Sequence, residues 1–430
     1  MEETKAYSIS VSELAASDAI PDAFSTAKQL IYASPATLAF HSPGAQGFGV
    51  KRAALVVPGS VMLLVAPACC GRNTRLLSEV KGYENRYFFL LMDESDIVTG
   101  RHLKKIPQAV QEILDFLDQK PSVVFLCSTC VDALLGTDWD RVAAKAEEAT
   151  GVPVRPCTMY ALTRQGRKPP METVRQTIYD LLPKTAKNPR ACNILGFFSD
   201  IDQESELFSI LKSFGLRKIR QVSSCRDYGE FQEMAEANFN LVLNPEAMLA
   251  AQDLEERLSI PSIEIRRLYQ LDKIHRQYEG LSRVLGASLD DGKYFLAAKS
   301  ALNAFQKKHR DLHISIGETL NANPFELSLA LSRYGFHVEE IFASVTANDL
   351  PYIRRLAALS PDTRVYTNLS PTMLFYDCGS ARVDLTIGQD AHFYHANTRN
   401  VPWNGDLQPF GYAGLAELIT QMDRALEERA

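Results

Sequence analysis

Short, uninterrupted apolar runs alternate with longer amphipathic segments along almost the whole chain of 430 residues. The runs that predict β-strands lie at residues 61–65, 87–92, 123–127, 194–198, 241–243, 313–316 and 338–342. Helical periodicity lies between them, as at 103–117, 206–214 and 324–334. Strands that are apolar throughout are buried on both faces. The alternation therefore predicts an α/β fold whose parallel sheets carry helices on both sides.

Polar joints that contain proline divide this pattern into three blocks. The segment PKTAKNPR, residues 183–190, predicts a linker. The charged helical pattern at 268–285 predicts a helix that bridges to the third block, in which Asn323 and Pro324 mark a helix start. We therefore predict three doubly wound, Rossmann-like domains: a first α/β domain over 1–189, a second with the bridging helix over 190–300, and a third over 301–430.

Composition and charge exclude several classes of protein. The net charge of −6 argues against a nucleic-acid binder, which needs a basic face. The N-terminus is acidic and polar, unlike a secretory signal. Residues 53–70 are apolar, but Pro58, Gly59, Ser60 and Pro67 interrupt them, so we expect a turn and a buried strand there instead of a membrane span. The sequence predicts a soluble cytoplasmic protein.

The strongest chemical signal is a set of four cysteines in the first block. Cys69 and Cys70 follow the predicted strand at 61–65. Cys127 ends the strand predicted at 123–127, and Cys130 follows it. Ligands of open α/β sheets bind beyond the carboxyl ends of parallel strands. Four thiols converging there would form a site for zinc or an iron–sulfur cluster, because soft thiolates select such metals.

Other interpretations of these cysteines remain open on spacing alone. The Cys127–Cys130 spacing also suits a redox pair, a zinc half-site or two small core residues. Adjacent side chains diverge, so only one of Cys69 and Cys70 is expected to bind this chain's metal, while the other does not or reaches across an interface. Cysteine is often simply buried, and this interpretation suits the other four: Cys157, Cys192, Cys225 and Cys378.

Seven segments match the motifs of one known superfamily in the same order along the chain. In residues 66–71 (APACCG) a glycine follows Cys70, and in 129–136 (TCVDALLG) a glycine lies six residues after Cys130. The others are 93–100 (DESDIVTG), 193–198, 240–245, 254–261 and 411–414 (GYAG). Through these motifs the chain resembles the large subunits of nitrogenase and the nitrogenase-like reductases. That superfamily includes the nitrogenase cofactor-assembly scaffold and dark-operative protochlorophyllide reductase.

The resemblance implies an iron–sulfur cluster, of the [4Fe-4S] type, with Cys70 and Cys130 as ligands and Cys127 and Cys69 as the next candidates. Family members usually carry a further cluster cysteine upstream, but that position falls at Phe40 here. Either the two extra thiols rebuild a four-ligand set within one chain, or pairs of cysteines from two subunits meet at a dimer interface. Eight thiols at such an interface would suit a cluster larger than a single cubane.

The residues that hold nitrogenase's active-site cofactor are also replaced. The position of the cofactor cysteine matches Asn244, and the position of the histidine falls near Val401. His392 and His395 lie a few residues upstream, and we expect them to be surface or core histidines. Dinitrogen reduction by this chain is therefore not expected.

By resemblance, the chain is the iron–sulfur catalytic component of a nitrogenase-like reductase whose substrate is unidentified. It would form a homodimer, or a heterodimer with a paralogous subunit. An ATP-hydrolysing iron–sulfur reductase would deliver low-potential electrons, since the chain has no phosphate-binding G-x-x-x-x-G-K-[ST] motif. One alternative is a scaffold protein for metallocofactor assembly, which would release its cluster. The other is a Rossmann-type binding or glycosyl-transfer protein whose cysteines are structural.

Overall fold

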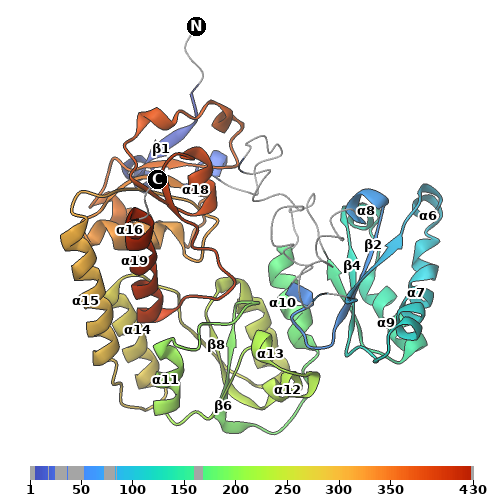
Figure 1. Ribbon diagram of the computed structural model, residues 1–430. Helices are drawn as coiled ribbons and strands as arrows, with labels where there is room; N and C mark the ends of the chain where they lie inside the picture. The colour runs from blue at the N-terminus through green and yellow to red at the C-terminus, as the bar shows by residue number, and fades with distance from the viewer. Residues whose placement is uncertain are drawn as a thin grey trace. The chain divides into compact units, whose positions relative to one another are not determined.

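The computed structural model describes residues 5–17, 19–24, 36, 53–71, 83, 85–158 and 168–427 (Figure 1). The chain separates into two compact units. One comprises Met1–Ala45, Ser199–Gly215 and Arg266–Ala430, and the other comprises Gln46–Phe198 and Leu216–Ile265. Three sheets are present among the described residues, and every strand pairing except β1–β12 is parallel. The predicted α/β class with parallel sheets is confirmed.

The first sheet has the strand order β3-β2-β4-β5. Its strands are β2 (Val61–Ala66), β3 (Tyr87–Leu91), β4 (Val124–Ser128) and β5 (Val154–Thr158). Residues 61, 63 and 65 of β2 pack in one core with α7 (His102–Phe116) and α9 (Trp139–Thr150). Residues 62, 64 and 66 pack in another core with α10 (Pro170–Asp180). Alternate side chains therefore face opposite layers, as expected for a strand buried on both sides.

The second sheet lies in the same unit and has the order β7-β6-β8-β9. Its strands are β6 (Asn188–Leu195), β7 (Lys218–Arg220), β8 (Ala237–Val242) and β9 (Ser262–Glu264). Helix α13 (Met248–Leu258) contributes to the core that also contains α10. Two expectations need correction here. Residue 188, placed in the predicted linker, already pairs with Ala237 in β8, and the strand predicted at 194–198 ends at residue 195.

A backbone constraint explains the early end of β6. Gly196 adopts a φ of +137°, which L-residues rarely adopt. A Cβ there would lie 2.7 Å from the backbone nitrogen of Asn244. The chain therefore turns sharply at the glycine, where it passes close to the end of β8.

The third sheet lies in the other unit, with the order β1-β12-β11-β10-β13-β14. The strands are β1 (Ser8–Ser10), β10 (His313–Ile316), β11 (His337–Phe342), β12 (Arg364–Tyr366), β13 (Leu385–Ile387) and β14 (Arg399–Val401). Helix α16 (Pro324–Arg333) begins as predicted, because the Asn323 side chain accepts hydrogen bonds from the backbone of Phe325 and Glu326.

The helix predicted at 268–285 is α14 (Leu271–Val284), which packs against α15 (Gly292–Lys308) and α19 (Gly411–Glu427). Its bridging role stays a prediction. The further helices are α1 (Val11–Ala16), α4 (Ala68–Gly71), α6 (Glu94–Thr99), α8 (Cys130–Leu135), α11 (Glu206–Ser213), α12 (Tyr228–Gln232), α17 (Leu350–Ala357) and α18 (Gln389–Tyr394). The domain boundaries at 189 and 300 stay a prediction.

Residues 53–60 form a turn that leads into the buried strand β2, as the sequence predicted for this apolar stretch. Among the helices of the described residues, none is both long enough and apolar enough to cross a membrane.

Candidate functional site

The first sheet has its topological switch point between β2 and β4. From β2 the chain continues to β3 on one side, whereas β4 and β5 lie on the other side. The two central strands pair directly, with Val65 opposite Ser128 near their carboxyl ends. Ligands of open α/β sheets bind in the crevice outside such a switch point. The cysteine-bearing segments follow these two strands.

Cys69 and Cys70 lie on the single-turn helix α4, directly after β2. Cys69 is exposed, whereas Cys70 is half-buried and packs against the core shared with α10. The two neighbouring thiols therefore have different surroundings, in line with the expected divergence of adjacent side chains. Of the two, Cys70 packs against the hydrophobic core.

Cys130 is the first residue of α8, directly after β4 and the N-cap residue Thr129. The helix ends at Gly136, whose φ of +67° lies in the left-handed region. A Cβ at Gly136 would meet no atom within 4 Å, so its conformation, and not space, requires glycine. The motif spacing between Cys130 and Gly136 is thus the length of one short helix with its C-cap.

Cys127 lies inside β4 and not in the loop that follows it. It is completely buried, and its register partner in the neighbouring strand is Cys157 of β5. A hydrogen bond with Cys127, together with burial, raises the pKa of the Cys157 thiol well above its ordinary value. The structure therefore places Cys69, Cys70 and Cys130 at the edge of the sheet and Cys127 in the core. The four-cysteine ligand set stays a prediction, and Phe40 lies outside the described residues.

Three buried polar atoms next to Cys130 have no hydrogen-bond partner within the described residues: Ser128 Oγ, Thr129 Oγ1 and Asp132 Oδ2. A buried donor or acceptor without a partner costs about 1–3 kcal/mol, so these atoms call for a group that completes their bonding. Hydroxyl donors beside soft thiolates suit a cluster with sulfide acceptors. The residues present at this edge therefore fit an iron–sulfur group.

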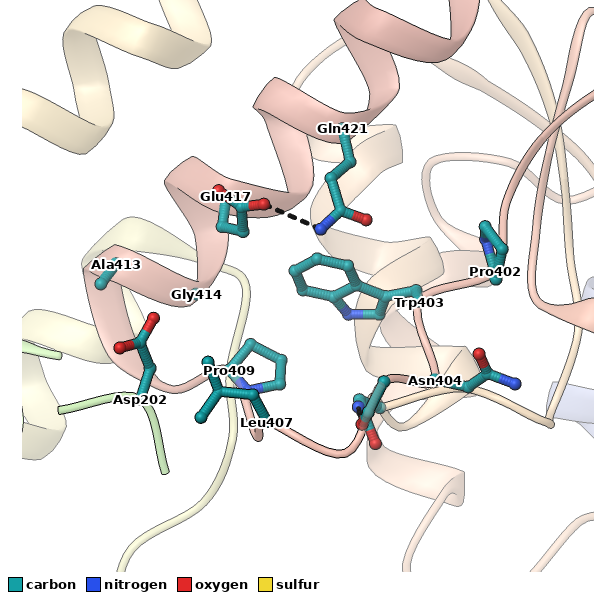
Figure 2. A pocket seen from close by; sticks show the side chains of 12 residues that line it. Asp202, Pro402, Trp403, Asn404, Leu407, Pro409, Ala413, Gly414, Glu417 and Gln421 are labelled. Carbon is teal, nitrogen blue, oxygen red and sulfur yellow. Dashed lines mark hydrogen bonds between the residues drawn. The ribbon is translucent and has the colours of Figure 1, made fainter. Parts of the chain in front are cut away.

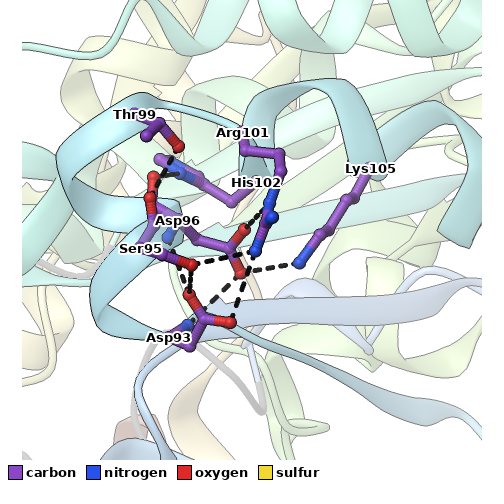
Figure 3. A network of polar contacts seen from close by, with 7 residues as sticks. All are labelled: Asp93, Ser95, Asp96, Thr99, Arg101, His102 and Lys105. Atoms are coloured by element: carbon purple, nitrogen blue, oxygen red, sulfur yellow. Dashed lines mark hydrogen bonds and ion pairs between the residues drawn. The ribbon is translucent and has the colours of Figure 1, made fainter.

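A buried carboxylate organises the segment that precedes α7 (Figure 3). Asp96 has no exposed surface, and it accepts hydrogen bonds from Arg101 Nε at 2.8 Å and Lys105 Nζ at 2.7 Å. Those hydrogen bonds, from Lys105 first, hold the pKa of Asp96 well below its ordinary value. Asp93 and Asp96 also form a reciprocal capping box at the start of α6. This network explains the motif at 93–100.

His102, the first residue of α7, joins this network to the cysteine helix. Its Nδ1 lies 3.0 Å from the backbone oxygen of Asp96, and its Nε2 lies 3.2 Å from Asp132 Oδ1. Both ring nitrogens of His102 thus face oxygens. Because the backbone oxygen of Asp96 can only accept, Nδ1 donates to it, and Nε2 is left to bond with the Asp132 carboxyl. Burial raises the pKa of Asp132, although His102 partly offsets this effect. Sequence reasoning found the segment but not this contact, since its two partners come from separate helices.

The positions that match nitrogenase's cofactor ligands carry no thiol or imidazole. Asn244 follows β8 and caps a short 3-10 helix by accepting a hydrogen bond from the backbone of Glu246. Val401 ends β14 and is buried. His395 is a core histidine, as expected, because its Nε2 lies 2.7 Å from Glu340 Oε2 and 2.8 Å from the Tyr376 hydroxyl.

A cavity of about 390 Å³ lies beside α19 in the unit that contains the third sheet. Figure 2 shows Trp403 between the hydrogen-bonded pair Glu417–Gln421 and the loop that carries Leu407 and Pro409. Trp403 has a φ of +45°, and its indole nitrogen donates a hydrogen bond of 2.7 Å to the Tyr269 hydroxyl. The cavity therefore has a fixed aromatic wall with an amide and a carboxylate beside it.

Comparison with known proteins gives consistent results. Residues 45–427 match the family model described as nitrogenase component 1 type oxidoreductase. The nitrogenase iron-molybdenum cofactor biosynthesis protein NifE of Rhodobacter capsulatus is 23% identical over 393 residues, covering 85% of this chain and 80% of that protein. NifE of Sinorhizobium fredii is 24% identical over 359 residues, covering 78% and 71% respectively.

The solved structure "Nitrogenase Cp1 at pH 6.5" superposes on this chain with a TM-score of 0.69. The superposition covers 89% of this chain and 91% of that one, with 16% sequence identity. A second structure, "Nitrogenase Cp1 at pH 5", superposes with a TM-score of 0.62 at 15% identity. At this level of identity, the likeness shows a shared fold.

Proposed function

The chain belongs to the nitrogenase component 1 type oxidoreductase family, and on that premise we propose that it is a scaffold protein for metallocofactor assembly that holds an iron–sulfur cluster. The observation that carries the proposal is the switch point between β2 and β4 of the first sheet. Cys70 and Cys130 follow these two neighbouring strands, and the buried hydroxyls of residues 128 and 129 there have no partner among the described residues. Relatives that match most of the chain are named as cofactor biosynthesis proteins, which favours assembly over substrate turnover.

Cys70 and Cys130 are the proposed principal ligands. A [4Fe-4S] cluster takes four thiolates, so two more must come from elsewhere. Cys69 is exposed on the same turn as Cys70 and is free to supply one across an interface, whereas Cys127 must leave its place in the core to bind. Such a cluster, once bound, supplies iron and sulfide that an acceptor can receive.

The chain's own residues bind and orient this group. The Ser128 and Thr129 hydroxyls, buried and without a partner among the described residues, would donate hydrogen bonds to it, and such bonds to sulfur tune the stability and the potential of a cluster. Asp132 Oδ1 and His102 Nε2 form a hydrogen bond in the first turn of α8. Since the Asp132 side chain is bonded to α7, it also fixes α8, and with it the backbone of Cys130.

A subunit interface at this edge would complete the ligand set. Leu134 and Leu135 of α8 expose 70% and 47% of their surface, and Val98 of α6 exposes 85%. Apolar side chains exposed beside a half-complete ligand set support association with a second copy of the chain or with a paralogous subunit. In either case, each subunit would contribute the thiols that the other lacks.

A second candidate function is the catalytic component of a nitrogenase-like reductase. The family's description as oxidoreductases favours it, as does the aromatic-walled cavity beside α19. This function requires an ATP-hydrolysing iron–sulfur reductase that passes low-potential electrons to the cluster, and a substrate that accepts them. The two candidates share the cluster and differ in what leaves the protein: a cluster or electrons.

The decisive experiment is anaerobic purification, with analysis of iron, zinc and acid-labile sulfide and an absorption spectrum. We expect a brown protein with iron and sulfide in similar amounts. The Cys70→Ala and Cys130→Ala variants should each lose most of the iron, whereas Cys378→Ala, an exposed cysteine in the other unit, should keep it. A colourless wild-type protein, or full iron content in both cysteine variants, would overturn the proposal and favour structural cysteines.

The assembly function is then tested by transfer. The iron-loaded protein is mixed with an iron-free acceptor protein that binds [4Fe-4S] clusters, and the two are separated and analysed. A scaffold loses iron and sulfide together to the acceptor. If the cluster stays bound but is reduced by dithionite and reoxidised in repeated cycles, the reductase candidate is favoured instead.

A further inference from the structure

We propose that Asp311, His313 and His337 form a second metal site, which binds a divalent transition metal of the Zn²⁺ class. The three residues lie in the unit that contains the third sheet, at the amino-terminal edge of its central strands. One ligand atom from each residue lies within 4.8 Å of the other two. The site shares no residue with the cysteine edge of the first sheet, so it is independent of the proposed function.

The strand register brings the two histidines together. His313 is the first residue of β10, His337 is the first residue of β11, and the two are direct partners in the parallel pairing. Side chains of register partners point to the same face of a sheet. The imidazole rings accordingly stack, with their centroids 4.7 Å apart and their planes 19° apart. Asp311 lies two residues before His313, in the turn that leads into β10.

The distances match the spacing of ligands around a small metal ion. Asp311 Oδ1 lies 3.5 Å from His313 Nε2 and 3.3 Å from His337 Nε2. Zinc–nitrogen and zinc–oxygen bonds of roughly 2.0–2.2 Å place tetrahedral ligands about 3.3–3.5 Å from one another. Two of the three edges therefore already have the required length. The third, between the two histidines, is at most 4.8 Å, and binding requires the half-exposed His337 ring to move toward His313.

A carboxylate orients the first histidine. Glu339 Oε1 lies 2.7 Å from His313 Nδ1, on the side of the ring opposite Asp311. Because a carboxylate accepts hydrogen bonds, Nδ1 of the neutral imidazole donates this bond and Nε2 keeps its lone pair. That arrangement, a carboxylate behind a histidine, is the one that orients histidine ligands in metal sites. Here it directs the Nε2 lone pair of His313 toward Asp311 Oδ1.

The charge around the site favours a cation. Arg382 donates a hydrogen bond of 2.9 Å to Asp311 Oδ2, which leaves Oδ1 for the metal. Arg382 also pairs with Asp384, which accepts a hydrogen bond from the backbone of His313. With Glu339, which contacts His313, the group contains three carboxylates and one guanidinium. Neutral imidazoles would leave this group of side chains with a negative charge.

The ligand set defines the class of metal. Two imidazole nitrogens and one carboxylate suit Zn²⁺, Fe²⁺, Co²⁺ or Ni²⁺, whereas Ca²⁺ and Mg²⁺ prefer all-oxygen sites. Three protein ligands leave at least one position for water, and the exposure of Asp311 and His337 gives solvent access to it. A bound ion would link β10, β11 and the turn before β10. We therefore expect it to stabilise this end of the third sheet.

The test is a zinc titration of the full-length, metal-free chain in competition with a coloured chelator, under anaerobic conditions. The wild type should bind one zinc ion per chain more than His337→Gln. Because His337 is half exposed, this variant is expected to fold, and circular dichroism checks that it does. The matched control is His275→Gln, since His275 has a similar exposure and a carboxylate partner, Asp291, but lies outside the site. It should bind as much zinc as the wild type.

Two further measurements separate a built site from adventitious binding. Glu339→Ala keeps all three ligands but removes the orienting acceptor, so it should bind zinc about 10–100-fold more weakly. Zinc should also raise the thermal unfolding midpoint of the wild type and leave that of His337→Gln unchanged. Equal zinc stoichiometry and affinity in the wild type, His337→Gln and Glu339→Ala would overturn the proposal.

Discussion

His102 Nε2 lies 3.2 Å from Asp132 Oδ1, and this buried contact joins the first residue of α7 to the first turn of α8. Because the other ring nitrogen of His102 faces the backbone oxygen of Asp96, the histidine connects the charged network of α6 with the helix that begins at Cys130. The start of the helix that carries Cys130 is thus held by buried polar contacts. The consequences of removing each partner differ.

Removing the histidine should be the more damaging change. His102→Leu leaves the Asp132 carboxyl buried without its partner, and we expect the free energy of unfolding to fall by about 1–3 kcal/mol. Asp132→Asn keeps an amide that can donate to Nε2, so a smaller loss is expected. Urea unfolding at neutral pH measures both values. Equal stability of His102→Leu and the wild type would show that the contact does not matter for stability.

The two cysteines of the Cys-x-x-Cys motif should respond differently to substitution. Cys130→Ala should remove bound iron with little change in the urea midpoint, since it changes a residue at the sheet edge. Cys127→Ala should keep the iron and lower the urea midpoint, because its side chain is completely buried opposite Cys157. We expect that change to lower the free energy of unfolding by about 1 kcal/mol, through lost packing. Loss of iron in Cys127→Ala at unchanged stability would instead make Cys127 a ligand.

Gly411, which opens the motif at 411–414, should tolerate no side chain. Its φ is +63°, and a Cβ would collide with the carboxylate of Glu206 and the hydroxyl of Tyr278. That carboxylate accepts hydrogen bonds from the backbone of Tyr412 and Ala413 at the start of α19. Gly411→Ala should therefore lower the free energy of unfolding by about 1–3 kcal/mol or more.

The matched control for that change is Gly280→Ala. Gly280 lies within α14, and a Cβ there would meet nothing within 4 Å. Alanine should stabilise the helix by about 0.5–1 kcal/mol, because it loses less conformational freedom on folding. Thermal and urea unfolding of both variants give the comparison. Similar losses in both would argue against a specific collision at Gly411.

Stability should depend on pH through Glu326. Burial raises the pKa of Glu326 to about 7, and the carboxyl accepts hydrogen bonds from the backbone of Tyr269 and the side chain of Gln270. The folded state therefore holds a proton that the unfolded state releases near its ordinary pKa of 4.5. Its stabilising effect is complete below that value and is lost as the pH rises toward 7, by a few kcal/mol, on the order of the shift.

Glu326→Gln tests this pH dependence. The substitution removes the ionisation while keeping an oxygen that accepts the hydrogen bonds. The urea midpoint of the wild type should decrease as the pH is raised from about 5 to about 7.5, and that of Glu326→Gln should decrease less over the same interval. Parallel curves for the two proteins would assign the pH dependence to other groups.

Much of the fold could be predicted because its strands are apolar throughout. Residues 313–316 form β10 as predicted, and Asn323 caps the next helix, since both signals are local. Residue 188 was misplaced because the linker pattern of prolines and lysines says nothing about pairing with β8. Cys127 ends the strand predicted at 123–127, and β4 continues one residue further, to Ser128.

The candidate sites could be predicted only in part, and for the same physical reason. Cys69, Cys70 and Cys130 come directly after apolar strands in the sequence, so their place beyond the ends of β2 and β4 could be predicted. The contact of His102 with Asp132, and the grouping of Asp311 with two histidines, depend on which helices and strands become neighbours. No local spacing carries that information. His313 and His337 share one face only because their strands pair in register.

The direct pairing of β2 with β4 has a consequence for how such a centre can diverge. Adjacent strands lie about 4.8 Å apart whatever side chains they carry, so the pairing fixes the distance between the two turns that follow β2 and β4. Side chains on those turns can therefore be substituted, or shifted by one residue, without changing the spacing of the strands. In this chain Phe40 stands where the resemblance leads us to expect a cysteine, and Cys69 stands beside Cys70. Its set of thiols therefore departs from the expected one, although the two strands that precede them pair directly.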